Sequence, residues 1–304
     1  MRRENSGLVH TTLEVVEEEQ RQDHQIRVIE PSGDTLMETF DGKPDVHCIH
    51  SQLHISAYHD KVPKIMWMHG EPLGSVANGI SMRAIVDLAP VCEAFICMRK
   101  EEWPVWDSIR RTYVVQKGTD LNRFVVQDKV EKLAGSPAVL YYENWRGQRN
   151  PLMICLAMQQ LQKEYPEAKL HLYNCPGGKM FDTFQKLIQH NRWWTFIGSL
   201  KGQEKDVVTL LNRADIVASG LYPLYARGIE AFGCGAAFIG PGYKEDDYPY
   251  QCDLNPGSIA AAIRKVWDDH KGENRQFFRD WAVKHHNIET TIKQTIEIYD
   301  RYLL

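Results

Sequence analysis

The residues from Gly228 to Gly242 form the pattern in this chain that is best suited to binding chemistry. Glu230 opens a short apolar segment that predicts a helix, and Gly233 and Gly235 predict its end. A carboxylate only accepts hydrogen bonds, so Glu230 can take two from the hydroxyls of a ribose. Helix-start amides and glycine-rich backbone bind phosphate. The pattern therefore indicates a ligand with phosphate and ribose, unless Glu230 serves only to favour the helix dipole.

Cationic side chains that could hold a diphosphate lie in two further places. Arg146 and Arg149 lie between a predicted strand and a predicted helix, and arginine can bind two phosphate oxygens at once. Arg227 precedes Glu230 by three residues, so it can reach the phosphates or pair with that carboxylate. Ligands of parallel α/β sheets bind beyond the carboxyl ends of the strands, which favours a diphosphate site at the first two arginines. A solvated basic loop is the alternative for them.

Two other strand ends carry candidate residues. His69 ends the apolar run 64–69 and precedes a glycine, so we expect its ring to face the ligand cleft. A simple hydrogen bond to backbone is the alternative for this ring. Lys117, Gly118 and Asp120 follow another predicted strand, and we expect them to form an interdomain loop that shapes the cleft. A plain turn would need only Gly118 and Asp120.

Strands and helices alternate along the chain, which predicts parallel sheets covered by helices on both faces. The predicted strands are residues 25–29, 45–50, 64–69, 94–98, 113–116, 138–142, 169–173, 194–198, 215–219 and 236–239. We therefore expect an α/β protein with two Rossmann-like, doubly wound domains that face a central cleft.

The polar stretch 126–137 is the expected linker between the domains. The N-terminal domain would then cover residues 1–125 and the C-terminal domain residues 126–282. The chain starts late for such a domain, because Ser6 and Gly7 resemble the end of the glycine turn that normally follows a first strand. We expect that first strand to be missing and the N-terminal domain to be short.

Composition narrows the class of protein. The 304 residues are 43% hydrophobic and 25% charged, and the net charge of -4 comes without a basic tract, which argues against nucleic acid as a partner. The seven cysteines form no C-x-x-C pair, which predicts a reducing compartment and no metal site. No apolar run approaches the roughly 20 residues of a spanning helix, and no signal peptide is expected. We expect a cytoplasmic protein, and docking on a membrane surface stays open.

Seven short motifs follow one another in an order and spacing that is more specific than any one of them. They are Pro44–His50, Met66–Gly70, Gln116–Phe124, Arg146–Asn150, Phe196–Gly198, Leu211–Ser219 and Gly228–Ala231. In this order the chain resembles the GT-B glycosyltransferases, in particular the retaining family 4 group. The resemblance covers nearly the whole chain and is strongest between residues 113 and 239.

The resemblance implies a hexosyltransferase-type enzyme that moves a sugar from a nucleotide-diphosphate donor to an acceptor with retention. The acceptor would be a glycan, a lipid-linked sugar or another carbohydrate. The resemblance implies no metal, and no cofactor apart from the nucleotide-sugar co-substrate. By the same resemblance the C-terminal domain binds the donor and the N-terminal domain the acceptor. The last helix, at about 283–304, would pack back on the N-terminal domain.

The resemblance also implies roles for single residues. His69 would lie beside the donor sugar and diphosphate, and Arg149, with Arg146, would hold the diphosphate. Glu230 matches the second glutamate of the family's E-x7-E motif, which holds the donor ribose. His69, Arg149 and Glu230 are thus the expected catalytic residues. The other expected donor-binding residues are Gly7, Arg146, Gly198, Tyr222, Arg227, Gly228 and Ile229.

The chain departs from the family pattern at three points. Tyr222 stands where the first glutamate of E-x7-E is expected, and residues 223–227 replace a glycine-rich phosphate turn. The Arg-to-Lys spacing of the diphosphate motif is not kept either. Two alternatives therefore stay open. One is a catalytically weakened nucleotide-sugar-binding or partner subunit. The other is a nucleotide-sugar epimerase on the same fold, which would need an additional acid–base pair of carboxylates.

Overall fold

The structure is a computed structural model with two compact units. It describes residues 21, 46–49, 61–68, 86, 89–98, 100, 103–143, 150–173, 184, 193–198, 204–220, 226–241, 243, 247–273 and 275–303. The first unit comprises Met1–Gly118 and His286–Leu304, and the second comprises Thr119–His285. The expected strand at 25–29 and the expected glycine turn at Gly7 lie outside the described residues. The expectation of a missing first strand therefore stays a prediction.

The first unit is built on a parallel sheet. Its described strands are β1 (His47–Ile49), β2 (Lys64–Met68), β3 (Ala94–Cys97) and β4 (Thr112–Val114), in the spatial order β1-β2-β3-β4. All residues of β2 and β3 are buried. This explains why both strands are nearly continuous apolar runs, since a parallel sheet is covered on both faces.

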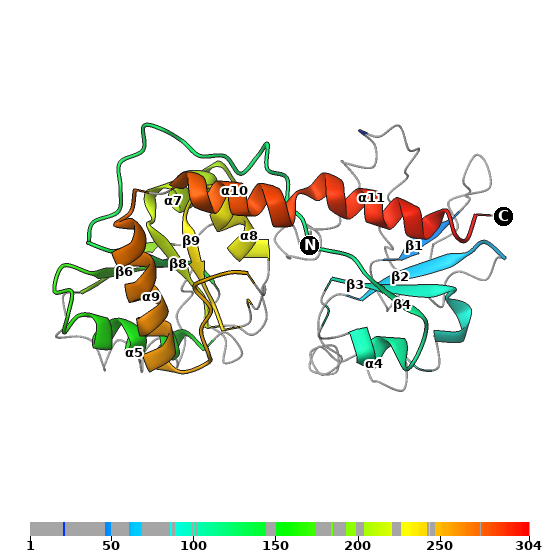
Figure 1. Ribbon diagram of the computed structural model, residues 1–304, viewed down its shortest axis with the longest axis horizontal. Helices are drawn as coiled ribbons and strands as arrows, with labels where there is room; N and C mark the ends of the chain where they lie inside the picture. The colour runs from blue at the N-terminus through cyan, green and yellow to red at the C-terminus, as the bar shows by residue number, and fades with distance from the viewer. Residues whose placement is uncertain are drawn as a thin grey trace. The chain divides into compact units, whose positions relative to one another are not determined.

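Side chains of β2 alternate between the two faces of this sheet, as strand geometry requires. Met66 and Met68 belong to a buried cluster with Trp106 of helix α4 (Trp103–Asp107), near the short 3-10 helix η2 (Ala89–Val91). Ile65 and Trp67 belong to another cluster, formed with helix α11 (Ile288–Tyr299). The C-terminal helix therefore completes the core of the first unit (Figure 1).

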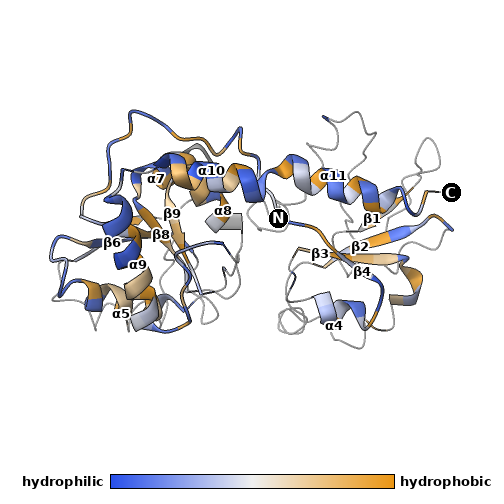
Figure 2. Cartoon of the chain, viewed as in Figure 1, coloured by the Kyte–Doolittle hydropathy of each residue, from blue (hydrophilic) through white to orange (hydrophobic). Residues whose placement is uncertain are grey.

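Helix α11 is amphipathic, and Figure 2 shows hydrophobic and hydrophilic residues mixed along it. The side chain of Asn287 accepts a hydrogen bond from the Glu289 amide at 3.1 Å and so caps its first turn. Thr291 Oγ1 donates to the carbonyl of Gln116 at 2.7 Å. Gly118 approaches the helix so closely that a Cβ there would lie 2.6 Å from the Cα of Ile288. Only glycine fits at this contact without a shift of backbone.

The second unit contains a five-stranded parallel sheet. Its strands are β5 (Ala138–Tyr141), β6 (Lys169–Tyr173), β7 (Trp194–Gly198), β8 (Ile216–Ala218) and β9 (Ala237–Ile239). Their spatial order is β7-β6-β5-β8-β9. The order reverses between β5 and β8, which is the place where doubly wound sheets bind ligands. Both sheets confirm the parallel α/β architecture predicted from the alternating strands and helices.

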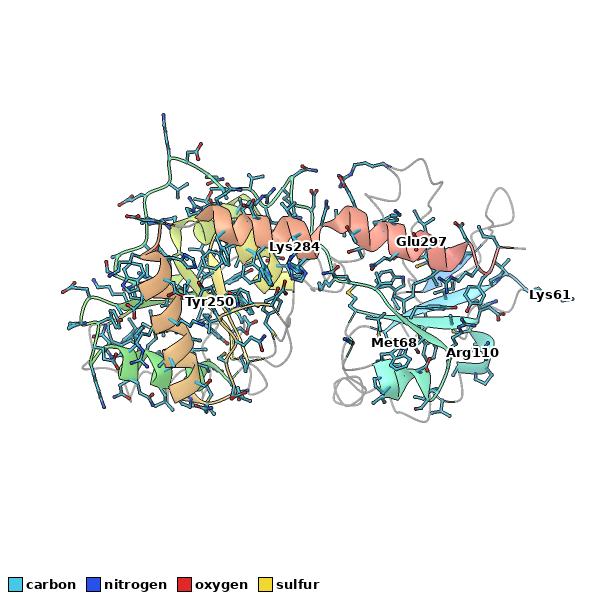
Figure 3. The ribbon with its side chains drawn as sticks, viewed as in Figure 1. Lys61, Met68, Arg110, Tyr250, Lys284 and Glu297 are labelled. Carbon is cyan, nitrogen blue, oxygen red and sulfur yellow. The ribbon has the colours of Figure 1, made fainter. Side chains whose placement is uncertain are left out.

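Helices pack in pairs around this second sheet. Helix α5 (Pro151–Leu161) packs against α9 (Pro256–His270), and α7 (Glu204–Arg213) packs against α8 (Ala226–Gly233). Helix α10 (Arg275–His286) contributes Phe278, Trp281 and Ala282 to the same core. Tyr250, labelled in Figure 3, packs against the rings of Phe277 and Phe278. None of the helices in the described part of the chain is long and apolar enough to cross a bilayer.

Residues that precede the expected linker at 126–137 already belong to the core of the second unit. Leu121 and Phe124 are buried in it. Asn212 of α7 fixes the following backbone, because its Nδ2 donates to the Val125 carbonyl at 2.9 Å. Its Oδ1 accepts from the Gln127 amide at 2.7 Å. Residues 121–127 therefore form a fixed part of the second unit.

Candidate functional site

Three strands of the second unit end side by side at one edge of the sheet. Because β5, β8 and β9 are parallel neighbours, their carboxyl ends meet there. The residues that follow the strands are all buried, and they are Tyr142, Glu143, Ser219, Gly220, Gly240 and Pro241. Helices α5 and α8 follow β5 and β8 along the chain. We take this carboxyl edge as the candidate site.

Glu230 lies on α8 and is held by a residue that follows β5. Its Oε2 accepts a hydrogen bond of 2.6 Å from the hydroxyl of Tyr142. Only 8% of Glu230 and 1% of Tyr142 are exposed. A buried carboxylate needs hydrogen-bond donors to offset its lost hydration. Within the described part of the chain Tyr142 is the one such donor, so Oε1 can accept from a ligand hydroxyl.

The C-terminal end of α8 is fixed by its glycines. Gly235 has a φ of 76°. Its amide donates to the Phe232 carbonyl at 2.8 Å, and the Ala236 amide donates to the Ala231 carbonyl at 2.9 Å. These two bonds form a Schellman motif, which needs a left-handed residue and hence favours glycine. The glycine turn predicted after this helix is therefore confirmed.

Two arginines of α10 bind the carbonyl oxygens at the same helix end. Arg279 Nη1 donates to the Gly233 carbonyl at 2.9 Å, and Arg275 Nη2 donates to the Cys234 carbonyl at 2.7 Å. Cations at a helix C-terminus also interact favourably with its dipole. Burial lowers the pKa of both guanidinium groups below the ordinary arginine value. The helix that carries Glu230 is thus anchored at its far end.

The same guanidinium groups reach the segment 121–127. Arg279 also donates to the carbonyls of Leu121 and Phe124. Arg275 also donates to the Gln127 carbonyl at 3.0 Å and to Asn212 Oδ1. Helices α8 and α10 and this segment therefore form one hydrogen-bonded block within the second unit.

The N-terminal end of α5 lies at the carboxyl edge. Its first residue is Pro151, and the preceding Asn150 has a φ of 44°. Asn150 does not cap the helix with its side chain but donates from Nδ2 to the Gly220 carbonyl at 3.1 Å. Among the described residues, no side chain caps the first turn of α5. The free backbone amides at the start of an uncapped helix, together with the positive end of the helix dipole, can bind an anion.

Cys234, which follows α8, is not suited to nucleophilic chemistry. It is fully buried, and burial together with the charge of Glu230 raises the pKa of its thiol to about 12. Since the thiolate is the reactive form, this thiol stays protonated at neutral pH. No group of three metal-binding side chains occurs within the described residues.

A small cavity lies at the opposite edge of the sheet. It has a volume of about 10 Å³ and is lined in part by Asp215, Gly235 and Arg275. Asp215 and Gly235 precede β8 and β9, so this cavity is at the amino ends of the strands. It has room for about one water molecule and is not a substrate site.

The structure places only some of the residues expected at the site. Gly228, Ile229 and Glu230 are buried in α8, where Arg227 also lies, and Gly198 ends β7 at the carboxyl edge. Five of the expected residues lie outside the described part of the chain: Gly7, His69, Arg146, Arg149 and Tyr222. The last described residue before His69 is Met68, at the end of β2 (Figure 3).

The residues expected in the interdomain loop have defined contacts. The Lys117 carbonyl lies 3.0 Å from His286 Nδ1, and Gly118 packs against α11 in the first unit. Asp120, in the second unit, accepts a hydrogen bond from the Asn122 amide at 2.9 Å. Tyr142 and Asn150 were not predicted as site residues, because contacts between segments that are distant in the chain leave no local pattern.

Comparisons with known proteins identify the fold. No model of a protein family matches this chain, and no curated protein matches it in sequence. HepE from Anabaena, solved with UDP, superimposes with a TM-score of 0.68 at 15% identity over 84% of this chain and 79% of HepE. The pneumococcal O-GlcNAc transferase GtfA, solved with UDP and GlcNAc, has a TM-score of 0.65 at 11% identity, covering 85% of this chain and 57% of GtfA.

A glycosyltransferase from Rickettsia africae matches over 100% of this chain and 83% of its own, with a TM-score of 0.61 at 12% identity. At such low identity these likenesses establish the fold alone. The chain has the GT-B fold, as expected from the order of its motifs.

Proposed function

We propose that this protein is a glycosyltransferase that moves a sugar from a nucleotide-diphosphate donor to an acceptor. The observation that carries the proposal is the buried Glu230 carboxylate at the carboxyl edge of the second sheet. Tyr142 occupies one oxygen, and the other can accept from a ribose hydroxyl. HepE, which shares the fold, was solved with UDP and with UDP-glucose, and this supports the same class of ligand here.

The proposed chemistry is electrostatic. When the bond between sugar and phosphate breaks, negative charge develops on the leaving diphosphate. Arg146 and Arg149 lie in the chain just before the uncapped start of α5, and Arg227 lies in α8 before Glu230. Positive groups at these places would stabilise the leaving group, and one such contact commonly contributes about 10²–10³ in rate.

The remaining assignments follow the family resemblance. We assign donor binding to residues 126–282 and acceptor binding to residues 1–125, completed by the last helix at about 283–304. His69 would lie beside the donor sugar. Transfer would retain the anomeric configuration and would need no metal. No strong protein base would be needed either, because the departing phosphate takes the acceptor's proton. The acceptor would be a carbohydrate or a lipid-linked sugar, and the reaction would run in the cytoplasm.

Two measurements in sequence test this function. Ribonucleoside diphosphates are first screened by thermal shift, because a ligand of the folded state raises its melting temperature. The matching nucleotide sugars are then assayed for nucleotide release with and without a panel of sugar acceptors. Release that depends on the acceptor supports transfer. Failure of every nucleoside diphosphate and nucleotide sugar to shift the melting temperature would overturn the proposal.

One observation favours a second candidate. Tyr222 replaces the first acidic residue of the family's E-x7-E motif, and a phenol cannot supply a carboxylate's charge. The protein could then bind a nucleotide sugar without turning it over, as a partner subunit. Tight binding with no release under any acceptor supports this reading, and a Tyr222→Glu variant that gains turnover would strengthen it.

A further inference from the structure

The contact between Tyr142 and Glu230 joins two elements that are far apart in the chain. Tyr142 follows β5, Glu230 lies on α8, and 88 residues separate them. Their oxygens are 2.6 Å apart, within the roughly 2.5–2.7 Å usual for a hydroxyl that donates to a carboxylate. Both residues are buried, so little water competes for this bond.

This bond is not needed to hold α8 in place. The helix already ends in a Schellman motif, and Arg275 and Arg279 bind carbonyls at that end. Ile229, Ala231 and Phe232 of α8 are fully buried. Against this fixed backbone, the Tyr142 hydroxyl holds Oε2 of the Glu230 side chain.

We propose that Tyr142 is a positioning residue: by holding Oε2 of Glu230 it aims Oε1 at the donor's ribose and so sets the preference for ribose over 2′-deoxyribose. The proposal rests on the proposed function, because it assumes that a nucleoside diphosphate binds at this edge. A free glutamate would have to be ordered when the ligand binds, which weakens binding. Tyr142 orders the Glu230 side chain before the ligand binds. This raises the affinity only of ligands whose hydroxyls hydrogen-bond to the carboxylate.

The test compares ribo- and 2′-deoxyribonucleoside diphosphates on matched variants. Calorimetry first identifies the ribonucleoside diphosphate with the highest affinity among UDP, GDP, ADP and CDP. Tyr142→Phe should weaken its binding by about tenfold, since a hydrogen bond to a charged group is lost. The 2′-deoxy analogue should lose less, so the ratio of the two dissociation constants should shrink. A purely structural role would lower the melting temperature without changing this ratio.

Two further variants make the result specific. In Glu230→Ala, which has no side-chain acceptor for the tyrosine, the effect of Tyr142→Phe should nearly vanish, because the tyrosine acts through the carboxylate. Tyr165 donates to Asp268 at 2.7 Å in the same unit, and Tyr165→Phe serves as the matched control, with an unchanged ratio. Tyr165 follows the C-terminal end of α5, away from the carboxyl edge at which that helix starts.

The possible outcomes separate the two proposals. Wild-type protein that binds none of the nucleotides overturns the proposed function and, with it, this inference. Wild-type protein that binds a ribonucleotide, with an unchanged ratio in Tyr142→Phe, overturns the inference alone. Equal losses from Tyr142→Phe in the wild-type and Glu230→Ala backgrounds do the same.

Discussion

We expect the imidazole of His171 to make the stability of the second unit depend on pH. It is buried in β6, and its Nε2 lies 2.6 Å from the Ala134 carbonyl. Burial lowers the pKa of His171 below its ordinary value of 6.5. The unfolded chain then binds more protons than the folded chain in the window between the two pKa values. Protonation of His171 should therefore leave the free energy of unfolding unchanged above about pH 6.5 and lower it as the pH falls below that value.

Urea unfolding between pH 7.5 and pH 5 measures this decline. In His171→Asn the slope of unfolding free energy against pH should be smaller, whatever the change in absolute stability. Burial also lowers the pKa of His270 and His285, so part of the slope should remain. A slope equal to that of the wild-type protein would contradict the assignment to His171.

At the residue scale, the sequence predicts Glu230 as a site residue but does not predict its hydrogen-bond partner, Tyr142. The carboxylate was expected near the start of a helix beside a glycine pair. The structure places it ahead of Gly233, as expected, but more than a turn into α8, which begins at Ala226. Its hydrogen bond to Tyr142 could not be read from the sequence, because it depends on β5 and β8 being neighbours. The expected roles of His69, Arg146 and Arg149 remain predictions.

At the scale of elements, α10 stabilises the second unit through its arginines. Arg279 donates to three carbonyl groups, those of Leu121, Phe124 and Gly233. Arg279→Met would keep the aliphatic stem but leave these carbonyls without their donor. Each unsatisfied buried carbonyl costs about 1 kcal/mol or more, so we expect a loss of about 2–4 kcal/mol in unfolding free energy.

The matched control is Arg264→Met on α9. Arg264 also binds with its guanidinium group, but its partner is the exposed carboxylate of Glu164. Water screens an exposed ion pair, so this variant should unfold nearly as the wild type does. Equal urea midpoints for the two variants would show that the carbonyl contacts of Arg279 do not stabilise the folded protein.

Local patterns predict elements better than their arrangement. The apolar runs at 64–69 and 94–98 were expected to be strands, and they contain β2 and β3. Such runs are apolar throughout because fully buried parallel strands need no polar face. The expected helix at about 283–304 is divided, since α10 ends at His286 and Asn287 caps a new helix. The order β7-β6-β5-β8-β9 depends on contacts between distant segments, which no local pattern contains.

At the scale of the whole molecule, the last helix belongs to the core of the first unit. Ile292 of α11 is fully buried in the cluster that contains Ile65 and Trp67. Ile292→Ala should cost about 2–4 kcal/mol, since it removes buried apolar volume. Calorimetry should show a lower melting temperature for the first unit and an unchanged one for the second. Val283→Ala, at a position 49% exposed, should change neither.

The chain shares its fold with HepE and GtfA at only 11–15% identity, and no family model matches it. Such persistence is expected when the pattern of burial in parallel strands, more than particular residues, specifies the architecture. The resemblance in motif order was therefore a better guide than any single motif.

Hydrogen–deuterium exchange with and without the tightest-binding nucleoside diphosphate tests the central claim most directly. The claim is that the nucleotide binds at the carboxyl edge of the second sheet, beside Glu230. Bound nucleotide should slow exchange in the first turn of α5, in residues 226–236 and in the segment after β5. Saturating nucleotide that slows exchange only elsewhere, for example in residues 61–118, would contradict it.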